Sequence, residues 1–165
     1  MGNKLKYLSS INSRKLDIII TTVLCTIVVL TRLPFVSKFL YEWDSVNYAL
    51  AFEKFDIIHH QPHPPGYIFF VWLGRVINII FNDANNTIIF ISIIFSILTV
   101  ILNYFLFKQM FSRIIAINTS ILLIFNPLFW FYGEIATIYL SEAFFATLIV
   151  YLSYHVIKGN EKYFY

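Results

Sequence analysis

Residues 87–107 form an apolar run without a single charged side chain. A helix needs about 20 mostly apolar residues to cross the hydrocarbon core of a bilayer. The composition of the whole chain agrees, because 59% of its residues are hydrophobic and only 13% are charged. A soluble domain is about 25% charged. The sequence therefore predicts an integral membrane protein.

Three further apolar segments are predicted to span the membrane, at residues 18 to about 33, 114 to about 131, and 138–157. A fifth segment, residues 66–81, is short for a span and carries Arg75 in its middle. A charge at the bilayer centre costs about 3 kcal/mol or more. We therefore expect this segment to lie along the membrane instead of crossing it.

The distribution of charge supports four spans with the N-terminus in the cytoplasm. That arrangement places eight of the twelve basic residues inside, as the positive-inside rule requires. They are Lys4, Lys6, Arg14, Lys15, Lys108, Arg113, Lys158 and Lys162. The acids collected outside are Glu42, Asp44, Glu53, Asp56, Asp83 and Glu134. A fifth span at residues 66–81 would move Lys108 and Arg113 outside and weaken the bias.

Two other features limit the class of protein. The basic N-terminus leads into an apolar run without a small-residue cleavage motif, which indicates an uncleaved signal-anchor. Cys25 is the only cysteine, which excludes an internal disulfide and a cysteine metal cluster. The net charge of +3 follows from the positive-inside bias, so we expect no nucleic-acid partner.

The first two spans are joined by a long extracytoplasmic loop, residues 34–86, and loops of this length are usually functional. Residues 45–58 have the amphipathic pattern of a helix lying in the membrane interface. Residues 66–81 are expected to form a second, more deeply seated helix, which Pro64 and Pro65 would start. The expected fold is thus an all-α membrane protein with about four transmembrane helices and two interfacial helices.

Asp44 lies just after the first span, at the expected outer surface of the membrane. An aspartate in front of an amphipathic helix is typical of an N-cap. A carboxylate partly shielded by Trp43 and the membrane is also suited to act as a general base that takes a proton from an acceptor hydroxyl. The two roles are compatible, and both stay open on the sequence.

Residues 59–66 form the densest polar cluster in this apolar chain, with histidines at His59, His60 and His63. The cluster is too rich in proline for a helix and lacks the HExxH spacing of a zinc site, so we predict no metal site. His60 and His63 are better suited to bind a phosphate, since a histidine can donate hydrogen bonds to an anion. Alternatively, the prolines only hold a rigid turn in which the histidines are solvated.

Four charged residues near or inside the apolar segments need partners. Arg75 is expected to contact an acid of the loop or a lipid phosphate, or to extend toward the headgroups, and Arg32 allows the same interpretations. Glu134 is expected at the outer end of the third span, facing the loop. Glu142 lies deeper, and an acid inside the membrane is a functional candidate by default.

Several short motifs place these residues in a known family. Thr31-Arg32-Leu33-Pro34, Glu42-Trp43-Asp44, His63-Pro64-Pro65-Gly66-Tyr67 and Asn126-Pro127-Leu128-Phe129-Trp130, with Glu134, resemble GT-C glycosyltransferases of the protein O-mannosyltransferase and aminoarabinose transferase type. The resemblance covers about residues 16–158.

The resemblance implies an inverting transfer from a polyprenyl-phosphate sugar, with a first-loop aspartate as base and basic residues on the phosphate. Asp44 matches that aspartate, and His63 matches a position where relatives often carry a basic residue. Ser45 departs from the family, because many relatives have a second acid there. Such enzymes also have more spans and a C-terminal domain, so residues 1–165 are expected to be the N-terminal portion of a longer enzyme.

The sequence hypothesis is a cell-membrane glycosyltransferase with an extracytoplasmic active face. Asp44 is its base, His60, His63 and Arg75 bind phosphate, and Glu134 lines the cavity. We expect a lipid-linked sugar donor, surrounding membrane lipids, and a protein, glycan or lipid acceptor, with no required cofactor and a divalent cation as the open alternative. The competing hypothesis is a small non-catalytic membrane protein whose loop binds a partner or a lipid headgroup.

Overall fold

The structure is a computed structural model that describes residues 2–159, with side chains for residues 13–159. The secondary structure of this region is helical. The α-helices are α1 (Gly2–Arg32), α2 (Trp43–Glu53), α3 (Ile68–Phe81), α4 (Ala84–Met110), α5 (Arg113–Ile124), α6 (Pro127–Phe131) and α7 (Tyr139–Ile157). Two 3-10 turns follow α1 and α2, at Leu33–Phe35 and Ile57–His59. The prediction of an all-α protein is confirmed.

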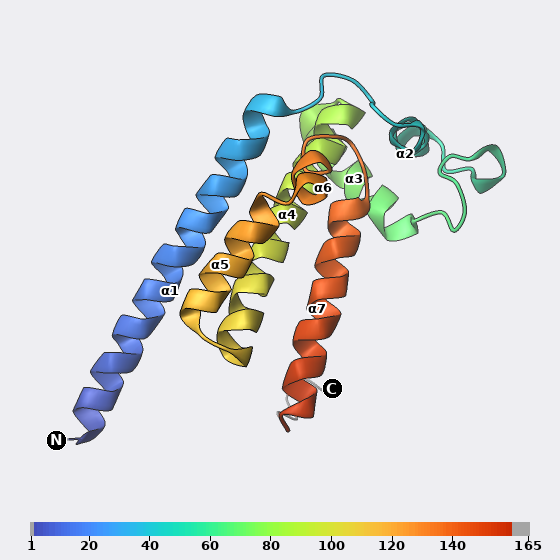
Figure 1. Cartoon of the computed structure of the whole chain (residues 1–165). Coiled ribbons are helices and arrows are strands. Elements are labelled where there is room, and N and C mark those ends of the chain that lie inside the picture. The colour runs from blue at the N-terminus through green and yellow to red at the C-terminus, as the bar shows by residue number, and fades with distance from the viewer. Residues whose placement is uncertain (1, 160–165) are drawn as a thin grey trace.

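Three helical segments are long and apolar enough to cross a membrane: Ser13–Phe35, Ala84–Met110 and Tyr139–Ile157. They correspond to the first, second and fourth predicted spans. Both ends of the described chain lie at one end of the bundle, and α2 and α3 lie at the other, as Figure 1 shows. Lys162 lies outside the described residues, as do the side chains of Lys4 and Lys6.

The predicted third span, residues 114–131, is not one continuous helix. α5 is 12 residues long, or about 18 Å, which is shorter than the hydrocarbon core. Asn126 interrupts the helix, because its Oδ1 accepts the backbone N–H groups of Leu128 and Phe129 and begins α6 at Pro127. In Figure 1, α5 and α6 together lead the chain back to the end of the bundle where the loop lies.

α4 is the centre of the bundle and packs against α1, α3, α5 and α7. One buried cluster joins Val28 of α1 and Val100 of α4 to Ile124 of α5. A second cluster joins Tyr48 of α2 and Phe70 of α3 to α4. The long loop is thus packed onto the bundle through its own apolar side chains.

The first loop helix differs from its prediction at both ends. α2 is capped by Glu42 instead of Asp44, and the Ser45 Oγ accepts the Glu42 backbone N–H at 3.3 Å. Asp44 lies within the first turn, so the N-cap interpretation is wrong and its carboxylate is not used for capping. α2 ends at Glu53, and the expected continuation to residue 58 is wrong because the chain turns extended at Lys54.

The second loop helix begins later than predicted. Pro64 and Pro65 do not start α3, because Gly66 and Tyr67 follow them with positive φ angles of 96° and 42°. The left-handed conformation of these two residues ends the extended turn, and the helix begins at Ile68. Residues 59–66 therefore form a folded turn between α2 and α3.

α2 and α3 approach closely at Gly74. A Cβ atom on Gly74 would lie 2.2 Å from the Phe52 ring, so only glycine leaves room for this ring. One helical position further on, the Arg75 guanidinium donates to the Ala51 carbonyl oxygen at 2.8 and 3.2 Å. These contacts hold the two loop helices together.

Gly74→Ala is expected to destabilise the loop by about 1–3 kcal/mol, because the Phe52 ring must move. Thermal unfolding in detergent measures the effect. Ile80→Ala is the matched control on α3, since Ile80 is 80% exposed and its loss leaves the α2 contact intact. Equal melting temperatures for wild type and Gly74→Ala would contradict this packing argument.

Candidate functional site

Asp44 and His63 come together between α2 and the turn that precedes α3. The His63 Nδ1 lies 3.4 Å from the Asp44 Oδ1, and both side chains are partly exposed, at 26% and 33%. α2 supplies Asp44 from its first turn, and the chain reversal at Asp56 and Gln61 brings His63 back to it. The sequence named both residues as candidates, and the fold makes them one site.

Two tyrosines enclose the His63 ring. The Tyr48 ring centroid lies 5.9 Å from that of His63, and the Tyr67 centroid lies 5.2 Å from it. Tyr48 is 1% exposed, and its hydroxyl has no hydrogen-bond partner among residues 13–159. Burial raises the pKa of the Tyr48 hydroxyl, with Tyr67 and Asp44 adding to the effect. Tyr48 therefore stays neutral and available to donate a hydrogen bond.

Two further acids, Glu42 and Glu142, interact electrostatically with Asp44 and Tyr48. Burial, and then Asp44, raise the pKa of the Glu42 carboxyl. Glu142, near the start of α7, interacts electrostatically with Tyr48, as does Tyr139. The site thus combines residues of α2, the turn before α3 and the N-terminal end of α7.

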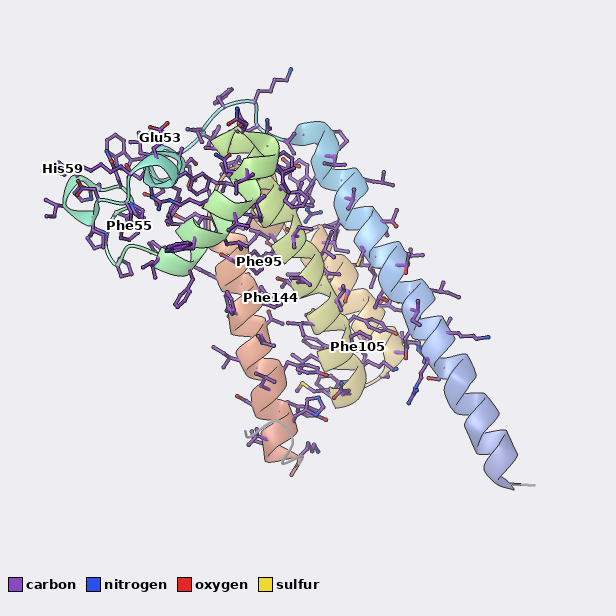
Figure 2. All side chains as sticks on the ribbon, turned by 180° about the vertical axis from the view of Figure 1, so that it is seen from behind. Glu53, Phe55, His59, Phe95, Phe105 and Phe144 are labelled. Carbon is purple, nitrogen blue, oxygen red and sulfur yellow. The ribbon has the colours of Figure 1, made fainter. Side chains whose placement is uncertain are left out.

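An apolar cavity of about 350 Å³ lies beside the tyrosines, between α3, α4 and α7. Phe70 and Leu73 of α3, Phe95 of α4 and Phe145 of α7 line it, together with Tyr67 and Glu142. Figure 2 shows Phe95 and Phe144 where α4 and α7 face each other. Because Tyr67 contacts both the cavity and His63, the acid and histidine pair lies close to an apolar space.

The other two histidines of the cluster have different surroundings. His59 lies at the outer end of the loop with Glu53 and Phe55 (Figure 2), where its Nδ1 is 2.9 Å from the Asp56 Oδ2. Lys54 and His59 hold the pKa of Asp56 well below its usual range. His60 is exposed. With the Asn47 side-chain amide oriented so that its oxygen accepts from the Trp43 Nε1, the amide nitrogen donates to the His60 backbone carbonyl at 3.1 Å.

The three histidines therefore do not converge on one point. No group of three histidine, cysteine or acidic side chains within residues 13–159 is arranged to hold a metal ion. Trp43, which precedes Asp44, is itself 76% exposed. The aromatic rings that contact His63 are those of Tyr48 and Tyr67.

Arg75 forms no ion pair with an acid of the loop within residues 13–159. It binds the Ala51 carbonyl, near the end of α2 and about 10 Å along the helix from Asp44. Two of its donors serve this contact, and a guanidinium carries five N–H donors. The carbonyl of a loop helix thus takes the place of the expected acid, and the remaining donors of Arg75 are not used in this contact.

Glu134 lies beneath the start of the loop, next to Arg32. Arg32 is fully buried and donates to the Ile124 carbonyl at 2.9 Å and to the Thr31 hydroxyl at 2.7 Å. Burial raises the pKa of the Glu134 carboxyl, and the Arg32 charge opposes that shift. The Glu134 carbonyl accepts the Ser37 backbone N–H at 2.8 Å. The backbone carbonyl of Glu134 therefore holds the loop segment that leads to Asp44, and Glu134 does not line the apolar cavity as predicted.

Three residues of the site were not predicted from the sequence as functional: Tyr48, Tyr67 and Glu42. One signal was present, because Tyr48 follows Asp44 by four residues and so shares its helical face. Tyr67 carried no such signal, since its position depends on the folded turn. Glu42 was placed outside the membrane without a role, and the structure gives it one as the cap of α2.

The fold and site define a polytopic helical membrane protein with an acid and histidine pair beside an apolar cavity. A family model, dolichyl-phosphate-mannose-protein mannosyltransferase, matches residues 62–165. The chain belongs to this family of GT-C glycosyltransferases, as the sequence motifs predicted. The match includes His63, Arg75 and Glu134, whereas Asp44 and His60 precede it. No curated protein and no solved structure shows significant similarity.

Proposed function

We propose that this chain carries the donor site of a mannosyltransferase that takes sugar from a polyprenyl-phosphate lipid, as the family name indicates for dolichyl-phosphate mannose. The observation that supports this best is the Asp44 and His63 pair next to the apolar cavity at Tyr67. The cavity suits part of an isoprenoid chain, and the polar pair suits the phosphate and sugar. One site thus accommodates both parts of such a donor.

In this proposal Asp44 is the general base of an inverting transfer. Its carboxylate accepts the proton of the acceptor hydroxyl while that oxygen bonds to C1 of the sugar. The C1–O bond to the phosphate breaks, and its electron pair leaves with the polyprenyl phosphate. Because Asp44 is not used for capping and is one-third exposed, its carboxylate is accessible to an acceptor.

His60, His63 and Arg75 are the proposed phosphate contacts, and Glu134 acts by holding the loop. His60 is exposed, and Arg75 keeps donors that Ala51 does not use. We place the protein in the cell membrane, with a cytoplasmic N-terminus and an extracytoplasmic site. The acceptor is a protein hydroxyl, and the transfer requires no cofactor.

The cavity provides a direct test. Leu73→Trp is expected to raise the KM for dolichyl-phosphate mannose about 10-fold or more, because the indole fills space that the lipid chain needs. Transfer of radiolabelled mannose to protein is measured in membranes containing the full-length protein. The control is Val76→Trp, which adds the same ring one turn along α3 at a position that is 58% exposed and outside the cavity.

Three results are distinguishable. A raised KM in Leu73→Trp alone supports the lipid site. Equal KM values in both variants would contradict it. Binding of the donor without any transfer by the wild type would favour the alternative, a non-catalytic protein whose loop binds a lipid headgroup.

A further inference from the structure

His63 presents its two ring nitrogens to different surroundings. Its Nδ1 is buried and faces Asp44, and no group in the described part of the chain forms a hydrogen bond with it. The ring as a whole is still 26% exposed. The other ring nitrogen, Nε2, forms no hydrogen bond in the described part of the chain and is not one of the buried unpaired atoms, so it lies on the exposed side of the ring. Tyr48 and Tyr67 contact the ring and limit its rotation.

The contact with Asp44 determines which nitrogen must carry a proton. A lone pair on Nδ1 would face a carboxylate oxygen at 3.4 Å, so a proton on Nδ1 is favoured. The separation is longer than a formed N–H···O bond, as is common for catalytic contacts before substrate binds. With Nδ1 directed to Asp44, Nε2 remains for a ligand.

We propose that His63 bridges the base and the leaving group: Nδ1–H binds Asp44, and Nε2–H binds the donor phosphate. The bridge rests on the function proposed above and assigns both nitrogens of one residue. In the step itself, Asp44 receives the acceptor's proton and the phosphate receives the electron pair of the broken C1–O bond. The His63 imidazolium keeps both of its protons and stabilises the negative charge that develops on the phosphate.

The bridge makes transfer depend on the charge of His63. Only the imidazolium donates from both nitrogens, so binding of the phosphate should weaken as pH rises and the imidazolium is lost. The titratable groups that face the ring are Asp44 and Tyr48 of α2 and Tyr67 before α3. Behind them, the Asp44 charge acts on the Glu42 carboxyl, and Glu142 and Tyr139 act on Tyr48.

Two amide variants separate the halves of the bridge. The His63→Asn amide reaches about as far as Nδ1, so it keeps the Asp44 contact and loses the phosphate contact. The His63→Gln amide reaches about as far as Nε2 and does the reverse. We expect kcat/KM for dolichyl-phosphate mannose to fall about 100-fold in both. The loss should appear chiefly in KM for His63→Asn and chiefly in kcat for His63→Gln.

The pH dependence distinguishes the bridge from a structural role. Wild type should lose kcat/KM on the alkaline side, and both amide variants should lack that limb because an amide does not titrate. His59→Asn is the matched control, since His59 is 70% exposed and contacts Asp56 instead. An alkaline limb unchanged in both variants, or kcat/KM within about threefold of wild type, would overturn the proposal.

A binding measurement separates this inference from the proposed transfer reaction. Polyprenyl phosphate without sugar is titrated into the full-length protein in nanodiscs at acidic and alkaline pH. The bridge predicts about 10-fold weaker binding at alkaline pH for wild type, and no pH dependence for His63→Asn. If this holds and no transfer is found, the phosphate contact stands and the catalytic function fails. If wild-type binding is independent of pH, the bridge is wrong even where transfer occurs.

Discussion

Asparagine in place of Asp44 is expected to reduce mannosyl transfer by about 10²- to 10⁴-fold. The amide has nearly the shape of the carboxylate but cannot accept the proton of the acceptor hydroxyl. Initial rates with radiolabelled dolichyl-phosphate mannose, in membranes containing the full-length protein, measure the loss. The KM for the donor should change little, because the apolar cavity and the histidines remain.

This substitution should leave the fold intact. α2 is capped by Glu42 and not by Asp44, and Ser45 completes the first turn, so asparagine at position 44 removes no cap. Glu53→Gln removes an acid from the opposite end of the same helix and should keep wild-type rates. If Asp44→Asn turned over at the rate of Glu53→Gln, Asp44 would not be the base.

Methionine in place of Arg32 is expected to destabilise the protein by about 3–5 kcal/mol. Arg32 is fully buried, and its guanidinium lies 5.6 Å from the Phe129 ring centroid and donates to the Ile124 carbonyl. Methionine fills much of the space but leaves Glu134 buried without a cation. Thermal or denaturant unfolding in detergent measures the loss, and the exposed Arg14→Met is the control.

The same variant should show a characteristic dependence on pH. Burial raises the pKa of Glu134 above its unfolded value, and removing Arg32 raises that pKa further. A raised carboxyl pKa means that the folded state binds the proton more tightly, so stability falls as pH rises through that pKa. Arg32→Met should therefore be closer to wild-type stability in mildly acidic solution than at neutral pH.

A double variant completes the test. Arg32→Met with Glu134→Gln removes both charges, and it should recover part of the stability and lose the pH dependence. Additive losses in the two single variants would show that Arg32 and Glu134 are not coupled. In that case the pair of Arg32 and Glu134 would not explain how the first residues of the loop after α1 are held in place.

The membrane class and the helical fold followed from the sequence because they depend on local properties. An uncharged apolar run such as residues 87–107 has no stable place in water, whatever its neighbours are. Within residues 114–131, however, hydropathy alone does not reveal that the Asn126 side chain ends one helix and begins another. The motifs also indicated the family, which the match over residues 62–165 confirmed.

The sequence by itself determined that the chain is a helical membrane protein, and it identified Asp44, His60, His63, Arg75 and Glu134 as candidates. Only the tertiary structure decided which of them meet. Asp44 and His63 became one site because the antiparallel pairing of Asp56 with Gln61 turns the chain back toward α2 just before His63. Arg75 and Glu134 instead acquired partners in Ala51 and Arg32. Such pairings depend on packing between residues distant in sequence, which local patterns of hydropathy and charge do not encode.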